Sequence, residues 1–284
     1  MLHGSHGLTT ARPLARRALA ALCAASLLLS GCANEGGRGK ESSNNGPRGE
    51  RAVTLEGRSF GDPLESAKAH TELAFAYFQR GQMAVALDEV TVALKSRPDY
   101  FQAYNVLGLI QMDLSQNPKA EEAFRKALSM APNDSDTLNN FGWFLCQTGR
   151  EREGIPQFLA ALKNPLYATP SKPYLNAGIC SEKIGDSAAA EEYYRKAFGL
   201  EPGNPTVMMR LGDLYYKRNE LDKARFYIDR VNKNFDPSAG SLWLALRIER
   251  KSGNQPSESS YAAQLRRRFP DSPEYQRMQQ GQFE

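Results

Sequence analysis

Two segments of the chain decide its fold: residues 73–98 read LAFAYFQRGQMAVALDEVTVALKSRP, and residues 107–132 read LGLIQMDLSQNPKAEEAFRKALSMAP. The two segments align without a gap at a spacing of 34 residues, with small side chains matched to small ones. The matched pairs are Ala74 with Gly108, Ala86 with Ala120, Ala93 with Ala127, and Pro98 with Pro132. A spacing of this length, kept over whole segments, indicates a chain built from one repeated supersecondary unit.

The repetition continues beyond these two segments. Prolines close the units at Pro98, Pro132, Pro202 and Pro270, provided that two residues are inserted near residues 166–170. Small residues at two places per unit let two antiparallel helices approach closely, bulky residues fill the space between them, and proline ends the second helix. This pattern is the signature of the tetratricopeptide repeat. We therefore predict an all-α fold, a right-handed superhelix of six tetratricopeptide repeats with a concave face, over residues 65–271.

The N-terminal residues resemble the signal peptide of a bacterial lipoprotein. Three arginines precede an apolar run over residues 18–29, and Leu29-Ser30-Gly31-Cys32 follows. The run is shorter than the roughly 20 residues that span a bilayer as a helix. The resemblance implies a signal peptide over residues 1–31 and a lipid on the thiol of Cys32. The alternative is a buried cysteine after a simple secretory signal. Ala33, by the same resemblance, favours the periplasmic face of the outer membrane.

The remaining boundaries follow from composition. Residues 32–64 consist largely of Gly, Asn, Ser, Glu and Arg, a mixture that buries too little apolar surface to fold, so we expect a flexible tether. Residues 272–284 follow the last repeat, and we expect a short C-terminal tail there.

The charge balance gives no case for a nucleic-acid partner. The net charge is +4, but three of the 36 basic residues stand in the predicted signal peptide. Removing them leaves 33 basic against 32 acidic residues, a net charge of +1. Nucleic-acid binding normally requires a basic face or stripe.

Residues able to carry covalent chemistry are few. His70 is the one histidine beyond the predicted signal peptide, and we expect it to face the core of the first repeat in a structural role. Cys146 and Cys180 have no further ligand residues at metal-binding spacing. Glu121 and Glu191 fall at equivalent places in second helices, and we expect them on solvated faces opposite basic residues four positions on. We expect no enzymatic activity, no metal and no cofactor.

The predicted binding surface is the concave face. In tetratricopeptide folds the first helix of each repeat lines that face, and apolar side chains left there imply a partner that covers them. The predicted groove residues are Phe75, Phe78, Asn105, Leu109, Met112, Asn139, Trp143, Asn176, Ile179, Met209, Tyr216 and Trp243, with Asn140 among them. The alternative is that a tightly wound superhelix buries some of them itself. We expect the ligand to be an amphipathic or apolar segment of another protein laid in the groove.

Cys146 and Cys180 form a predicted disulfide. They lie 34 residues apart, and the repeat alignment places them on neighbouring first helices. Their Cα atoms could then approach the 4.4 to 6.8 Å that a bridge requires. The predicted periplasmic location permits oxidation. Closing such a loop stabilises by roughly 3 kcal/mol in the chain-entropy model. The alternative is a pair of free thiols packed between helices.

The third and sixth repeats resemble one family in particular. Residues 138–142 read LNNFG, residues 144–146 read FLC, and residues 261–270 read YAAQLRRRFP. These stretches resemble the PilF/PilW lipoproteins of type IV pilus biogenesis. The resemblance implies an outer-membrane lipoprotein that helps the secretin subunit reach the membrane and multimerise into the channel through which the pilus emerges.

Two other functions remain open at this stage. One is a periplasmic adaptor that delivers peptidoglycan hydrolases, a role played by other tetratricopeptide lipoproteins of similar size. A homodimer would favour that role, whereas we expect a monomer. The other is an enzyme whose active site the sequence does not reveal.

Overall fold

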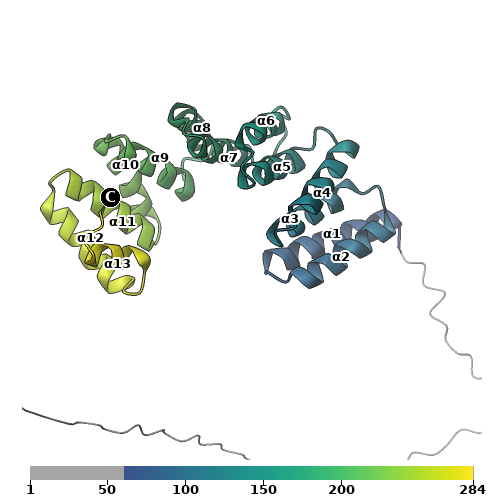
Figure 1. The fold of residues 1–284 in the computed structure, drawn as a ribbon, viewed down its shortest axis with the longest axis horizontal. Helices are drawn as coiled ribbons and strands as arrows, with labels where there is room; N and C mark the ends of the chain where they lie inside the picture. The colour runs from purple at the N-terminus through teal and green to yellow at the C-terminus, as the bar shows by residue number, and fades with distance from the viewer. Residues whose placement is uncertain (1–60, 284) are drawn as a thin grey trace, which may run out of the picture. The chain divides into compact units, whose positions relative to one another are not determined.

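The computed structural model of the protein describes residues 61–283, and every regular element in that part is an α-helix (Figure 1). The predicted signal peptide, Cys32 and nearly all of the predicted tether lie outside the described residues. The helices are α1 (Pro63–Gln79), α2 (Met83–Ser96), α3 (Phe101–Asp113), α4 (Asn117–Met130), α5 (Ser135–Gln147), α6 (Glu151–Ala161), α7 (Ser171–Lys183), α8 (Ser187–Leu200), α9 (Pro205–Lys217), α10 (Leu221–Asn234), α11 (Ala239–Lys251), α12 (Gln255–Arg268) and α13 (Pro273–Gln279). None of these helices is long and apolar enough to cross a bilayer.

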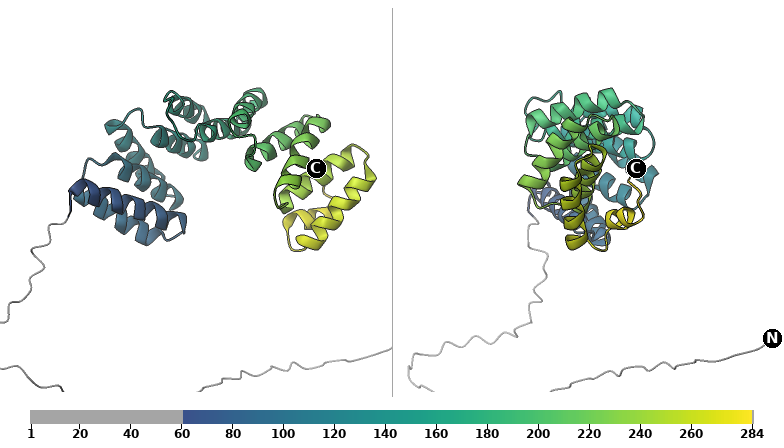
Figure 2. Two further views of the ribbon diagram at one scale, coloured as in Figure 1. Left: turned by 180° about the vertical axis from the view of Figure 1, so that it is seen from behind. Right: turned by 90° about the vertical axis from the view of Figure 1, so that its left-hand side faces the viewer.

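Consecutive helices pair into hairpins, and the hairpins follow one another side by side in chain order (Figure 2). Six hairpins run from α1/α2 to α11/α12, and each packs against the next. The predicted all-α architecture of six helical repeats is confirmed.

Each of the second to fifth hairpins has a glycine on its first helix packed against a large side chain on its second helix. A Cβ atom placed on Gly108 of α3 would lie 2.6 Å from the ring of Phe124 on α4, so only glycine allows this approach. Gly142 faces Phe158 in the same way in the next repeat, at 2.9 Å. Close packing of this kind leaves no room for an added methyl group. The small-residue position that the sequence pattern predicts is therefore where contact with a large side chain sets the distance between the two helices.

Helix ends follow the predicted signals. In the four repeats that close with a proline, the second helix of the hairpin ends two residues before that proline. Helix α2, for example, ends at Ser96 before Pro98. The residue before a proline is disfavoured in helical conformation, which explains the spacing. Between the helices of the third hairpin, Gly149 has φ of +80°, and Asn219 takes the same left-handed conformation in the fifth at +63°. Asparagine tolerates this region better than other non-glycine residues.

The helices differ from two of the predicted boundaries. Helix α1 begins at Pro63, two residues before the predicted start of the domain, because Asp62 caps it by accepting a hydrogen bond from the backbone N–H of Leu64 (3.0 Å). Residues 272–284 are not merely a tail, because they contain α13, which packs against α11 and α12. Tyr275 and Met278 place α13 on the apolar cluster of the last hairpin.

Ion pairs join the second hairpin to the third, the fourth to the fifth and the fifth to the sixth. Glu121 on α4 pairs with an arginine four residues on, as predicted, and also with Arg150 of the following hairpin at 2.9 Å. Glu191 on α8 departs from the prediction, since it bonds to Tyr215 (2.7 Å) and Arg218 of the following hairpin. The Tyr215 hydroxyl and Arg218 hold the pKa of Glu191 below its usual value. These carboxylates therefore connect repeats and are not simply part of a solvated face.

Gly108→Ala should lower the free energy of unfolding by about 1–3 kcal/mol, because the new methyl group would overlap the Phe124 ring. Gly199→Ala is the matched control, since a Cβ atom there meets nothing within 4 Å and alanine is favoured in helices. Urea unfolding followed by circular dichroism measures both. Equal destabilisation by the two substitutions would contradict the role given to Gly108.

Candidate protein-binding groove

The first helices of the first four hairpins line a hollow of about 740 Å³, which we call the N-terminal groove. The predicted residues that line it are Phe75 and Phe78 on α1, Asn105 and Leu109 on α3, Asn139 and Trp143 on α5, and Asn176 on α7. Residues that are distant in sequence thus share one face, as the repeat pattern predicted.

Apolar side chains supply the contact area of the N-terminal groove. Phe75 is 39% exposed and stacks on Phe78 with ring centroids 6.2 Å apart. Trp143 and Leu109 are half-buried and present their remaining surface to the same hollow. Exposed aromatic surface gathered in a concavity is typical of a site that a partner covers.

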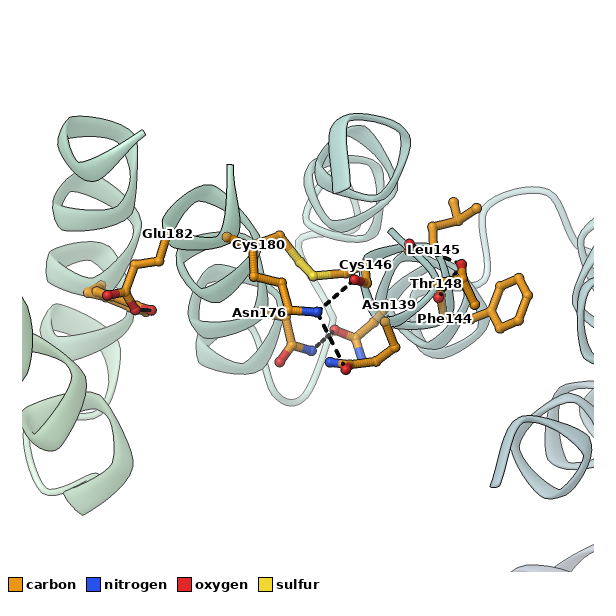
Figure 3. The surroundings of a disulfide bond; sticks show 11 residues. Asn139, Phe144, Leu145, Cys146, Thr148, Asn176, Cys180 and Glu182 are labelled. Atoms are coloured by element: carbon orange, nitrogen blue, oxygen red, sulfur yellow. Dashed lines mark hydrogen bonds between the residues drawn. A yellow bond between two sulfur atoms is a disulfide. The ribbon is translucent and has the colours of Figure 1, made fainter. Parts of the chain in front are cut away.

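Asparagines connect the helices at the floor of the groove. Asn140 donates to Asn105 across α5 and α3 (3.1 Å), and Asn176 donates to Asn139 across α7 and α5 (2.9 Å; Figure 3). Asn139 is 1% exposed and Asn176 9% exposed. The prediction that these two bind a partner directly is therefore corrected: their amides are used in joining repeats. Gln102 differs, since its buried Oε1 accepts no hydrogen bond from the described part of the chain.

The disulfide lies beside these asparagines. The structure joins Cys146 on α5 to Cys180 on α7, with Cα atoms 5.8 Å apart and both side chains fully buried (Figure 3). Lys183 donates to the backbone carbonyl of Cys146 at 2.8 Å, adding a second link between the same helices. The bridge spans the junction that contains residues 162–170, the longest connection between described helices and the place of the inserted residues. It fixes α7 against α5 where regular stacking is interrupted.

Charged residues at the rim were missed by the sequence analysis. Lys68 and Glu72 on α1, Asp136 on α5 and Lys172 on α7 also line the N-terminal groove. Each lies three, four or seven residues before a predicted groove residue on the same helix, so extending the stripe by one or two turns would have found them. Two acids and two bases leave the rim without net charge, so the aromatic surface dominates.

Tyr100 also lines the groove and also escaped the sequence analysis. Burial, with Glu72 and Glu65 nearby, raises the pKa of Tyr100. Its phenol therefore remains protonated at neutral pH and offers a hydrogen-bond donor to a bound segment.

The remaining predicted residues do not join this groove. Met209 and Trp243 line a second hollow of about 520 Å³ between α9 and α11, and Tyr216 lines a third of about 440 Å³. Met112 and Ile179 pack against apolar clusters and line none of the three hollows. The repeat pattern predicts one continuous open face for all of them, whereas in the structure they are divided among separate hollows and apolar clusters.

Two of these residues are buried, which corrects the prediction that they bind a partner. Trp243 is 4% exposed because the ring of Phe283 stacks on it at 5.5 Å. Tyr216 is 8% exposed because the guanidinium of Arg247 lies 4.3 Å from its ring centroid. The cause at Trp243 is the return of the chain after α13, which no repeat pattern signals.

His70 lies between the helices of the first hairpin. Its Nδ1 is 2.6 Å from Oε2 of Glu89 on α2, and the ring is about one-third exposed. It is thus less buried than predicted, and its contact links α1 to α2. Within residues 61–283, no group of three or more His, Cys, Asp or Glu side chains is placed to hold a metal ion.

Comparison with known proteins defines the class. Residues 80–236 match a family model described as tetratricopeptide repeat, a fold whose members bind other proteins. The chain is 32% identical to the type IV pilus assembly protein PilF of Pseudomonas aeruginosa over 215 residues, covering 76% of this chain and 85% of that protein.

Solved structures agree. The crystal structure of PilW, described as a widely conserved type IV pilus biogenesis factor, superposes with a TM-score of 0.70 at 33% identity over 75% of this chain and 98% of that one. The Pseudomonas aeruginosa PilF structure gives 0.69 at 31% identity over 77% and 99%. The chain therefore belongs to the tetratricopeptide-repeat proteins of the PilF/PilW type, which take part in type IV pilus biogenesis.

Replacing both bridge cysteines, Cys146→Ala with Cys180→Ala, should lower the free energy of unfolding by about 3 kcal/mol, because the loop between them is no longer closed in the unfolded chain. Thiol titration of the oxidised, denatured chain should give the same count before and after the double substitution. Two additional reactive thiols in the unsubstituted chain would contradict the bridge.

Proposed function

We propose that the protein is an outer-membrane lipoprotein that promotes localisation and multimerisation of the type IV pilus secretin. In this proposal a segment of the secretin lies in the N-terminal groove. The similarity to PilF and PilW supports the biological setting. The observation that carries the binding proposal is the group of aromatic side chains that lines a hollow of about 740 Å³: Phe75 is exposed, and Phe78 and Trp143 are half-buried. The repeat core does not require apolar residues at these places.

The contacts available in the groove favour an amphipathic segment. Apolar area comes from Phe75, Phe78 and Trp143, and the Tyr100 hydroxyl supplies a polar partner beside them. Binding energy in such interfaces is concentrated in a few desolvated aromatic residues. Hydrogen bonds between repeats and the disulfide fix the helices that form the floor of the groove. Binding of a partner therefore costs little conformational entropy in the groove itself.

A lipid on Cys32 would keep this groove at the membrane where the secretin assembles. Residues 33–60 separate that cysteine from the described domain. Several acyl chains on one cysteine give stable anchoring, since each buried methylene adds about 0.8 kcal/mol. The proposal therefore joins two separable parts, an anchor and a groove.

Phe78→Ala with Trp143→Ala should weaken binding of the purified secretin by several hundredfold, because each aromatic contributes on the order of 2 kcal/mol when desolvated and every 1.4 kcal/mol is about tenfold in affinity. Secretin multimers in cell membranes, counted on a gel that preserves them, should fall in parallel. Phe226→Ala on α10 is the matched control, since that ring is 51% exposed and lies outside the groove.

Unchanged secretin binding by a folded double variant, or equal loss in the Phe226 control, would remove the groove from the proposal. Circular dichroism establishes that each variant is folded. Recovery of peptidoglycan hydrolases in place of the secretin would favour the adaptor role.

Cys32→Ala should leave an unacylated precursor that is absent from the outer-membrane fraction, because the lipid acceptor is lost. Mass spectrometry of the mature N-terminus and membrane fractionation measure this. Cys23→Ala is the control, because Cys23 lies within the predicted signal peptide and should change neither result. Normal outer-membrane fractionation of Cys32→Ala would contradict the anchor while leaving the groove untouched.

A further inference from the structure

A second surface of different chemistry lies at the other end of the repeats. Arg247 and Lys251 project from α11 over Tyr216 of α9, with their charged groups 4.3 Å and 5.1 Å from the ring centroid. These three residues help to line the hollow of about 440 Å³, which we call the C-terminal site. It shares no lining residue with the N-terminal groove.

The two cations have no carboxylate partner within residues 61–283, where no Asp or Glu oxygen lies within 4.0 Å of either charged group. The other two basic residues of the site, Arg250 and Lys217, do have carboxylate partners. Arg250 pairs with Glu258 at 2.7 Å, and Lys217 pairs with Asp213 at 2.6 Å. Among residues 61–283, the side chains of the site therefore carry more positive than negative charge after the surrounding pairs are counted.

Helix electrostatics explains only part of this arrangement. Cations in the last turn of a helix are stabilised by the helix dipole, which accounts for Arg250 and Lys251. Arg247 lies one turn earlier, and its guanidinium lies over the Tyr216 ring, not at the end of the helix. The position of the Arg247 side chain is explained by its contact with the Tyr216 ring and by the segment of polypeptide that it binds.

That segment is the end of the described chain, at Phe283. The ring of Phe283 stacks on Trp243 at 5.5 Å and lies under the guanidinium of Arg250 at 3.9 Å. The backbone carbonyl of Phe283 accepts a hydrogen bond from Nε of Arg247 at 2.9 Å. A piece of polypeptide thus occupies the C-terminal site through an aromatic side chain and a main-chain acceptor.

We propose that the C-terminal site is a docking site for an acidic protein segment that carries an aromatic side chain. Arg247 and Lys251 receive the carboxylates, and Phe283 holds the aromatic position until the incoming ring displaces it. Charge complementarity commits the site to an anionic partner. The seated Phe283, with its main-chain hydrogen bond, favours a protein segment over an anionic lipid.

Binding of short labelled peptides to the full chain tests this proposal. The probe is fluorescein-labelled Gly-Asp-Glu-Phe-Asp-Gly, measured by fluorescence anisotropy at two salt concentrations. Two peptides serve as ligand controls: one has Lys at every acidic position, and the other has Ala in place of Phe. Vesicles of phosphatidylglycerol test the lipid alternative by co-sedimentation.

Arg247→Gln with Lys251→Gln should weaken binding of the acidic aromatic peptide about tenfold or more, because two charge-assisted contacts are lost. Arg266→Gln with Arg267→Gln on α12 removes the same charge from an exposed surface outside the site and should leave binding within about twofold. Phe283→Ala should strengthen binding about threefold or more, because the internal competitor is gone.

Any of four results would overturn the proposal. The first is an equal loss of affinity in the Arg247/Lys251 and the Arg266/Arg267 double variants, and the second is equal binding of the Lys-containing or the Ala-containing peptide. The third is weaker peptide binding by a folded Phe283→Ala variant. The fourth is binding to vesicles without binding to the acidic peptide. Because the C-terminal site shares no lining residue with the N-terminal groove, Phe78→Ala with Trp143→Ala should leave peptide affinity unchanged.

Discussion

The close approach of the two helices in the second to fifth hairpins is the constraint on which the rest of the structure depends. Gly108 against Phe124, repeated by Gly142 against Phe158, brings the helices so near that no side chain fits at the glycine. A hairpin this tight buries one side of each helix within itself and against its neighbours, so the first helices are left to line a common hollow. The binding surface is thus a by-product of how the repeats pack.

The floor of that hollow is made rigid where stacking is least regular. Asn139 and Asn176 join α5 to α7 on the groove side, and the Cys146–Cys180 bridge joins the same helices beside them. Buried amides that bond to one another are satisfied and do not need a ligand. Recognition in the N-terminal groove is therefore assigned to its aromatic residues and its rim, and the asparagines keep the helices in place.

The two ends of the domain differ because the last hairpin is covered and the first is not. Residues after α12 return as α13 and bring Phe283 onto Trp243, while Phe75 and Phe78 remain accessible. Among the described residues, one surface is apolar with a neutral rim, and the other is lined by basic side chains and by Phe283 of the same chain. A single array of repeats can in this way present separate surfaces to partners of different chemistry.

Sequence alone determined the hairpins, their number, the glycine contacts and the neighbouring positions of Cys146 and Cys180, because these depend on a local periodic pattern that is repeated along the chain. Only the tertiary structure decided which first-helix residues remain open. Asn139 is buried by a partner 37 residues away, and Trp243 by a ring that returns from beyond α13. Burial of this kind depends on contacts between repeats and on one non-repeating segment, and neither contributes to the periodic signal.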